Sequence, residues 1–232
     1  MITPSSSFYY SYFIMIDVSS LKTKRCVVIL SGGLSPFNIM EDDTVICADS
    51  GILSLHKEDM IPDILIGDMD SLPTKFVKEM ERKGVTVEIY PREKDLSDGE
   101  LAIKRAVAFS PLSIDIFGGK CGRADHILSS FYLLYKIPEE IESTLHLDSD
   151  QVILVREGNS FMGSTDRSVV SVLPAFERAR VTLKGLRWEL KNHLITMGST
   201  LGIHNESTGK PFEVMAEKGD IYLIFADEVP QA

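Results

Sequence analysis

The chain has 232 residues, 44% of them hydrophobic, and its 34 acidic residues outnumber its 24 basic residues, giving a formal net charge of -10. This length suits one large core or two modest ones, and the acidic balance argues against a protein that wraps the phosphate backbone of a nucleic acid. Three cysteines without C-x-x-C spacing argue against a disulfide or zinc framework.

The first 25 residues contain one short aromatic and apolar run, Phe8 to Ile16. This run is far shorter than the roughly 20 residues needed to cross a bilayer, and no basic segment precedes it. We therefore expect residues 1–25 to form a flexible extension, and we expect a cytoplasmic protein with no membrane partner.

Between residues 26 and 140, short apolar runs alternate with helical patterns, as in parallel βαβ units. Pro73 opens a predicted surface helix, and Gly84 stands where its C-terminal cap belongs. Ser97 and Glu100 form a capping box that predicts a second helix, and a third is expected over 124–136. The segment is thus predicted to be an α/β domain with a parallel sheet. Its predicted strands are CVVIL (26–30), DTVICAD (43–49), DILIGD (63–68), VTVEIY (85–90) and LSIDIFG (112–118).

After residue 138 the pattern changes to short alternating runs separated by turn residues. Such spacing without helical periodicity predicts an antiparallel β-sandwich, which we assign to residues 150–232. The boundary between the two domains is expected between residues 137 and 150. The runs are QVILV (151–155), SVVSVLP (168–174), ARVTLKG (179–185), FEVMA (212–216) and IYLIF (221–225).

Asp68 and Asp70 follow a predicted strand in the segment IGDMDS. In an extended chain, two carboxylates at this spacing lie on the same side, about 7 Å apart. Hard oxygen ligands so arranged suit Mg²⁺. The alternative is a solvated turn in which Ser71 caps the following helix.

Asp95 and Asp98 lie at the start of the helix predicted after Ser97, beside Arg92 and Lys94. The simple structural explanation is capping, because carboxylates are stabilised at the positive end of the helix dipole. Capping needs only one acid, however. The second acid beside two bases indicates a site in which acids hold metal and bases hold phosphate.

A glycine-rich turn, FGGKCG (117–122), precedes Arg123, Asp125 and His126. Backbone N–H groups in such a turn can converge on an anion, and Arg123 can add a bidentate phosphate contact. The alternative is an ordinary turn followed by a helix cap. Three other histidines lack metal-ligand spacing and are expected to be ordinary surface residues: His56, His146 and His193.

All three clusters follow predicted parallel strands, at the edge where open α/β sheets bind their ligands. The chain contains neither the P-loop pattern GxxxxGK[ST] nor the dinucleotide pattern GxGxxG. The clusters together predict an Mg²⁺-dependent enzyme that moves a phosphate-containing group from a nucleoside triphosphate to a small alcohol.

Five segments, taken in order, resemble the motif series of thiamine pyrophosphokinases. They are ICADSG (46–51), PDILIGDMDS (62–71), EKDLSDGELA (93–102), FGGKCGRADHILS (117–129) and LKGLRWEL (183–190). The resemblance covers nearly the whole chain after residue 25. It implies transfer of the terminal pyrophosphate of ATP to the hydroxyl of thiamine, giving thiamine diphosphate and AMP. It also implies a homodimer whose active sites lie between the α/β domain of one subunit and the sandwich of the other.

The resemblance also implies roles for individual residues by their positions in the motifs. The implied metal ligands are Asp68, Asp70, Asp95 and Asp98, and the implied catalytic residues are Asp68, Asp70, Asp98 and Arg123. The implied nucleotide-binding residues are Asp49, Lys94, Arg123, Asp125, His126 and Ser129. The implied thiamine-binding residues are Trp188, Asn205 and Ser207. An aromatic face such as that of Trp188 suits a cationic thiazolium ring, although a tryptophan on a strand is often a core residue.

The chain departs from the family pattern at Ser50, Ser130 and His204, where the family usually has glycine, asparagine and serine. None of these departures removes an acid. Two alternatives to the thiamine reaction stay open at this point: a pyrophosphokinase for another small alcohol such as a pterin, and a non-catalytic regulator that binds a nucleotide or thiamine.

Overall fold

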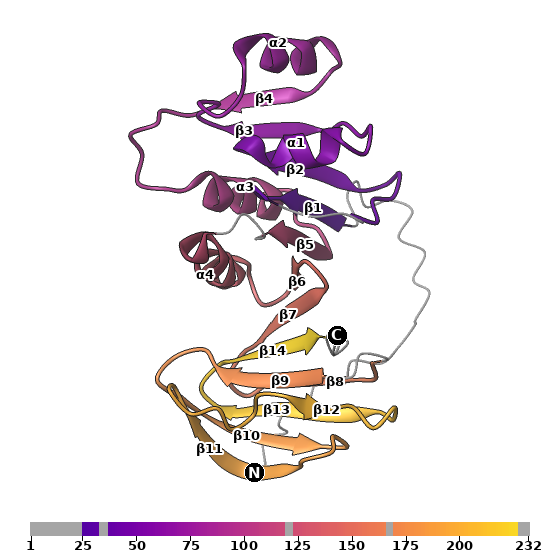
Figure 1. The fold of residues 1–232 in the computed structure, drawn as a ribbon, viewed down its shortest axis with the longest axis vertical. Coiled ribbons are helices and arrows are strands. Elements are labelled where there is room, and N and C mark those ends of the chain that lie inside the picture. Colours follow the sequence, from indigo (N-terminus) through magenta and orange to yellow (C-terminus); the bar gives the residue numbers. More distant parts are fainter. Residues whose placement is uncertain (1–24, 33–36, 119–122, 166–168, 227–232) are drawn as a thin grey trace, which may run out of the picture.

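The computed structural model describes residues 25–32, 37–118, 123–165 and 169–226 (Figure 1). The predicted extension, apart from Arg25, lies outside the described residues. In the described part of the chain, one ten-stranded sheet runs along the length of the molecule, and a four-stranded sheet packs against one end of it. The mixed sheet with helices and the separate antiparallel sheet confirm the predicted fold class.

Six strands of the large sheet are parallel, in the order β6-β5-β1-β2-β3-β4. Side chains of β1 alternate between two cores, because successive residues of a strand point to opposite faces. Helices α3 and α4 cover one face, and α1 and α2 cover the other. The strands are β1 (Arg25–Ile29), β2 (Thr44–Ala48), β3 (Ile64–Gly67), β4 (Thr86–Ile89), β5 (Ser113–Gly118) and β6 (Glu142–Leu147). The helices are η1 (Asp49–Gly51), α1 (Ile52–His56), α2 (Thr74–Arg82), α3 (Asp98–Val107), α4 (Ala124–Leu133) and η2 (Leu134–Lys136).

The predicted helix signals act as expected at α2 and α3. Gly84 follows α2 with a φ of 95°, and its N–H donates to Glu81 O while Val85 N donates to Met80 O, which is a Schellman ending. Ser97 caps α3, where its Oγ accepts from Glu100 N at 3.2 Å. The start of α3 fixes the position of Asp98, its first residue.

The antiparallel half continues the same large sheet and adds the second sheet to it. Strands β7, β14, β9 and β12 extend the large sheet beyond β6, and the second sheet has the order β11-β10-β13-β8. An apolar core fills the space between the two sheets. The strands are β7 (Asp150–Val155), β8 (Ser160–Gly163), β9 (Val169–Pro174), β10 (Arg178–Lys184), β11 (Leu190–Thr196), β12 (Asn205–Glu206), β13 (Phe212–Lys218) and β14 (Ile221–Ala226).

Strands β6 and β7 join the two halves through the tight turn at Asp148 and Ser149. The predicted boundary therefore falls on paired strands of a continuous sheet. A polar cluster strengthens this junction: Tyr135 Oη donates to Asp220 Oδ2 at 2.9 Å, and the Arg156 guanidinium lies 4.4 Å from the Tyr135 ring centre. No helix in the described ranges has the length and apolar character to cross a bilayer.

Candidate active site

Asp49 lies at the carboxyl end of β2 and is only 8% exposed. Its Oδ2 accepts a hydrogen bond from Ser71 Oγ, whereas its Oδ1 is buried with no hydrogen-bond partner among the described residues. Burial raises the pKa of Asp49, and the negative charges of Asp98 and Asp68 raise it further against the opposing effect of the Ser71 hydrogen bond. The carboxylate is thus held in a position that disfavours its charge.

Asp68 and Asp70 follow β3, but the chain there is a turn and is not extended as predicted. Met69 has a φ of 60° and packs into the core on the α1 and α2 face of the sheet. The backbone therefore bends, and Asp70 N donates to Asp68 Oδ1 at 3.1 Å. Carboxylate oxygens of Asp49, Asp68 and Asp70 lie within 4.8 Å of one another. Ser71 bonds to Asp49, and Pro73 precedes α2 as its cap, so the alternative role of Ser71 as a helix cap is wrong.

Asp98 joins this group because Gly67 has no side chain. A Cβ on Gly67 would lie 3.2 Å from Cγ of Asp98 and 3.2 Å from Cβ of Asp49. The two acids therefore approach each other across the bare backbone of β3. Oδ1 of Asp98 is buried, and its partner among the described residues is Lys94 Nζ, which lies 2.9 Å away as an ion pair.

Two cations border the acidic group, both from the loop between β4 and α3. Lys94 pairs with Asp98, and Arg92 Nε lies 3.5 Å from Asp70 Oδ2. Asp95 lies in the same loop but is exposed, and it is not among the carboxylates that gather within 4.8 Å. The structure therefore brings four acids and two bases together at this edge of the sheet and leaves Asp95 outside the group.

The predicted nucleotide-binding residues of α4 lie at the same edge of the sheet, beyond β5. Arg123 makes a two-point ion pair with Asp125, with Nε–Oδ1 and Nη2–Oδ2 distances of 3.2 and 2.6 Å. Both side chains are exposed, and Arg123 lowers the pKa of Asp125. Ser129 Oγ donates to His126 O at 3.0 Å, as expected for a hydroxyl within a helix. Residues 119–122 of the glycine-rich turn lie outside the described residues.

Trp188 lies in the connection between β10 and β11, and half of its surface is exposed. It is therefore not a core residue, which was the alternative to a ligand-facing role. The Arg187 guanidinium covers one side of the indole at 4.9 Å from the ring centre and also pairs with Glu206. Ser207 Oγ donates to Thr165 O at 3.3 Å and accepts from Gly209 N at 3.2 Å.

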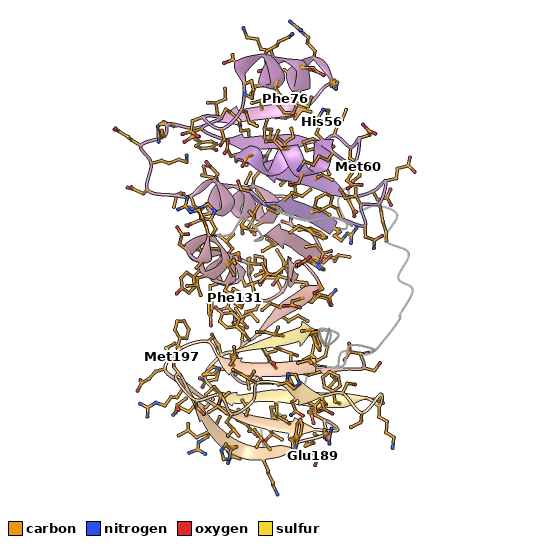
Figure 2. The ribbon with its side chains drawn as sticks, viewed as in Figure 1. His56, Met60, Phe76, Phe131, Glu189 and Met197 are labelled. Atoms are coloured by element: carbon orange, nitrogen blue, oxygen red, sulfur yellow. The ribbon has the colours of Figure 1, made fainter. Side chains whose placement is uncertain are left out.

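The acidic group and the Trp188 region lie far apart in one chain. Figure 2 places His56 near one end of the molecule; this residue ends α1, the helix that follows Asp49. It places Glu189, the neighbour of Trp188, at the other end. Asn205 lies in β12, and eight inter-strand steps separate β12 from β3. At about 4.8 Å for each step, the separation is about 38 Å. A single chain therefore cannot bring both sets of residues to one small substrate.

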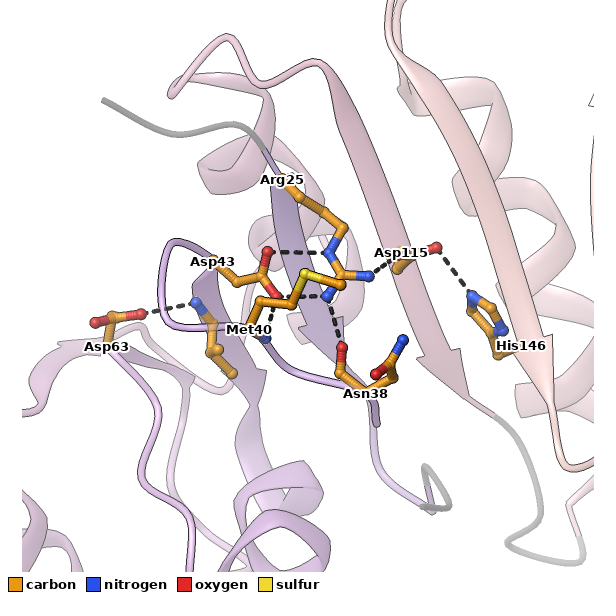
Figure 3. A network of polar contacts seen from close by, with 8 residues as sticks. Arg25, Asn38, Met40, Asp43, Asp63, Asp115 and His146 are labelled. Atoms are coloured by element: carbon orange, nitrogen blue, oxygen red, sulfur yellow. Dashed lines mark hydrogen bonds and ion pairs between the residues drawn. The ribbon is translucent and has the colours of Figure 1, made fainter. Parts of the chain in front are cut away.

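One histidine was misread from the sequence. His146 was expected to be an ordinary surface residue, but its side chain is only 19% exposed, stacks on Phe117 at 4.5 Å and lies 2.9 Å from Asp115 Oδ1 (Figure 3). Asp115 in turn pairs with Arg25, so His146 belongs to a partly buried polar network. Leu145 and Leu147, the apolar neighbours of His146 in β6, are the sequence signal that indicates its partial burial.

Open α/β sheets bind their ligands at the carboxyl edge, and the acids and bases gathered there in this chain suit an α/β enzyme that acts on phosphate-containing groups. The model of the thiamin pyrophosphokinase catalytic domain matches residues 38–145, and that of the thiamin pyrophosphokinase vitamin B1 binding domain matches residues 152–219. This chain is 32% identical over 193 residues to thiamine pyrophosphokinase of Bacillus subtilis (strain 168), a match that covers 78% of this chain and 89% of the relative. The chain therefore belongs to the thiamin pyrophosphokinase family.

Solved structures show the same similarity in three dimensions. The crystal structure of thiamine pyrophosphokinase from Bacillus subtilis aligns with a TM-score of 0.79 at 28% identity, covering 89% of this chain and 100% of that chain. That of thiamin pyrophosphokinase from Geobacillus thermodenitrificans aligns with a TM-score of 0.75 at 26% identity, covering 89% and 99%. Both alignments span the two halves of the large sheet, so the whole described architecture is shared.

Proposed function

We propose that this enzyme transfers the pyrophosphoryl group of ATP to the hydroxyl of thiamine in an Mg²⁺-dependent reaction, with the acidic group at the ends of β2 and β3 as the metal site. The observation that carries this proposal is the concentration of four carboxylates there, with only two cations beside them. Oδ1 of Asp98 is paired with Lys94, but Oδ1 of Asp49 is buried without a hydrogen bond from the described residues. Such an atom is costly in a folded protein unless a ligand satisfies it.

The donor set fits Mg²⁺. It consists of carboxylate oxygens alone, and Mg²⁺ prefers oxygen ligands and keeps several waters. Asp68 and Asp70 are the proposed metal ligands, with Asp49 and Asp98 completing the negative site. When bound, the metal neutralises charge on the phosphate oxygens. Asp95, the other acid implied by the family pattern, is exposed and is left out of this ligand set.

The bases around the acids suit the triphosphate. Lys94 and Arg92 already face Asp98 and Asp70, so they can pass from these acids to phosphate oxygens when ATP binds. Arg123 is proposed to make the same exchange from Asp125, next to His126 and Ser129 on α4. Transfer also requires that the thiamine hydroxyl lose its proton, and a carboxylate of the acidic group is the proposed acceptor.

We assign thiamine binding to the exposed face of Trp188, with Ser207 nearby. Because about 38 Å separates this region from the acids, the proposed enzyme is a homodimer in which the sandwich of one subunit faces the acidic group of the other. A cytoplasmic location is part of the proposal. Supporting it, Cys26 and Cys47 are buried free thiols, and free thiols are usual in a reducing compartment.

Incubation of the purified protein with ATP, Mg²⁺ and thiamine tests the reaction. We expect AMP and thiamine diphosphate to appear together in equal amounts. A pterin alcohol replaces thiamine in the parallel assay, and its faster conversion would instead support the other pyrophosphokinase. Tight binding of thiamine without any AMP would support a regulator and contradict the proposed catalysis.

Mixed dimers test the shared site. An Asp70→Asn subunit lacks the acidic site, and a Trp188→Ala subunit lacks the thiamine face. If sites form between subunits, a heterodimer of the two keeps one intact site of two. Since about half of the dimers in an equal mixture are heterodimers, dissociating and reassociating the mixture should restore about a quarter of wild-type activity at low thiamine. Activity no higher than the mean of the two separate variants would contradict the shared site.

A further inference from the structure

Asn205 was expected to contact thiamine, but its side chain is only 2% exposed. The amide faces the backbone of Trp188 instead. Its Oδ1 accepts from Trp188 N at 3.0 Å, and its Nδ2 donates to Trp188 O at 2.7 Å. Oδ1 also accepts from Glu206 N at 2.9 Å. Three of the four hydrogen bonds that an asparagine amide can make are therefore within the protein.

These contacts join the two sheets of the sandwich. Asn205 belongs to β12, where it pairs with Val170 of the large sheet. Trp188 belongs to the β10–β11 connection of the smaller sheet, 17 residues earlier in the chain. The two segments continue to pair on one side of these residues, because Arg187 N donates to Glu206 O at 2.9 Å and Leu186 forms a β-bridge with Ser207. The amide thus holds both polar groups of the Trp188 backbone against an edge strand.

The indole has few other constraints. It is half exposed, and Arg187 covers only one side of it. The orientation of the ring therefore depends on the backbone that carries it. An amide is suited to this role, since it offers a donor and an acceptor side by side, matching the N–H and C=O of a single residue.

We propose that Asn205 is a positioning residue, which fixes the Trp188 backbone and so presents the indole face to thiamine without touching the substrate itself. This inference rests on the proposed thiamine site for its effect on the reaction. We call the two hydrogen bonds between the Asn205 amide and the Trp188 backbone the clamp. The clamp does not depend on the thiamine site, because it can be measured in the ligand-free protein.

Trp188 is the only tryptophan in the chain, so intrinsic fluorescence reports its position directly. In the Asn205→Ala protein without ligand, we expect lower fluorescence anisotropy of Trp188 and stronger quenching by acrylamide. The thiamine KM should rise about tenfold with the ATP KM unchanged, since loss of net hydrogen-bond energy weakens the thiamine site alone. The matched control is Thr182→Ala, which removes a buried hydroxyl that bonds Glu217 and Asn192 elsewhere in the sandwich. It should change neither the fluorescence nor the ratio of the two KM values.

The Asn205→Asp variant keeps the shape of the side chain and covers the case in which Asn205→Ala does not fold. An ionised carboxylate keeps the acceptor but places an oxygen against Trp188 O, whereas a protonated carboxyl can donate there. We expect its anisotropy to be low at neutral pH and to recover toward the wild-type value as the pH falls.

Two results would overturn the proposal. Unchanged Trp188 fluorescence in ligand-free Asn205→Ala, with a raised thiamine KM, would mean that the amide contacts the substrate. Unchanged fluorescence and KM would mean that the clamp is dispensable. If the wild-type protein does not convert thiamine, the proposed function fails, yet the fluorescence of the two variants still decides whether Asn205 positions Trp188.

Discussion

Two aspartates flank strand β2, and their surroundings shift their pKa values in opposite directions. Asp43 precedes the strand and pairs with Arg25, while Met40 N donates to its Oδ2 at 2.7 Å (Figure 3). Burial alone would raise the pKa of Asp43, but the hydrogen bonds from Arg25 and Met40 outweigh it, so the pKa is lowered. Asp49 follows the strand, faces other acids and has a raised pKa.

The same contrast holds for the two edges of the parallel sheet. At the amino edge, Asp63 accepts from Val45 N at 2.8 Å, and Arg25, the first residue of β1, pairs with both Asp43 and Asp115. At the carboxyl edge, Asp49 keeps a buried oxygen without a hydrogen bond from the described residues, and burial with the nearby charges of Asp98 and Asp68 raises its pKa. The charge of Asp43 at the amino edge stabilises the fold, whereas the charge of Asp49 at the carboxyl edge costs stability. Such local costs are expected at functional sites.

The largest effect should come from Asp70→Asn at the carboxyl edge. Loss of one anionic ligand should lower kcat by about 100-fold or more, because the charge on the transferring group is no longer neutralised. The melting temperature should stay at the wild-type value, since Asp70 is exposed. The matched control is Asp95→Asn, which removes an exposed acid outside the group and should keep near wild-type kcat. Wild-type activity in a folded Asp70→Asn protein would refute the metal site.

Asp43→Asn should show the reverse behaviour, with loss of stability and unchanged kcat. It leaves Arg25 without its closest partner, which should cost about 1–3 kcal/mol of unfolding free energy at neutral pH. Because the folded pKa is lowered, this stabilisation is present above the unfolded pKa of aspartate and is lost as the pH falls through the folded pKa. Urea unfolding of wild type and variant should therefore converge in acid. Asp59→Asn, at an exposed aspartate, is the control and should change stability by less than about 0.5 kcal/mol.

The smallest effect should be a gain of stability in metal-free Asp49→Asn at neutral pH. A raised folded pKa means that ionisation of Asp49 opposes folding, so the wild type loses stability as the pH rises above the ordinary pKa of aspartate. The variant avoids this loss and should be more stable by up to about 1 kcal/mol. Adding Mg²⁺ should raise the melting temperature of the wild type more than that of the variant. A variant less stable than wild type at every pH without Mg²⁺ would show that the hydrogen bond from Ser71 outweighs the cost of the buried charge.

The sequence predicts the elements with strong apolar patterns and misses those with mixed ones. β1 and β2 are almost entirely buried and read clearly as strands. β11 is exposed along most of its length, so its residues carry no alternating pattern, and β6 mixes polar and apolar residues at the seam between the halves. The continuity of the large sheet could not be predicted either, since it depends on pairing between β6 and β7.

In the candidate site too, the sequence predicts the residues that carry local signals and misses the features that depend on packing. Asp49, Asp68 and Asp98 could be found because each stands directly after a strand or at a helix start, which are local features. The turn at Met69 could not, because it depends on packing of that side chain beneath the sheet. The clamp of Asn205 on Trp188 joins residues from different sheets, so no local pattern reports it.

The seam between β6 and β7 has a consequence for dividing the chain. The two family models meet there, which suggests a cut that would yield a catalytic half and a vitamin-binding half. Yet Leu145 pairs with Val152 across this seam, and both are buried in a core that also contains Tyr222. A cut at Asp148 would give each fragment a newly exposed strand edge with apolar side chains beside it. Such edges recruit other strands, so the separate halves should aggregate when they are expressed alone.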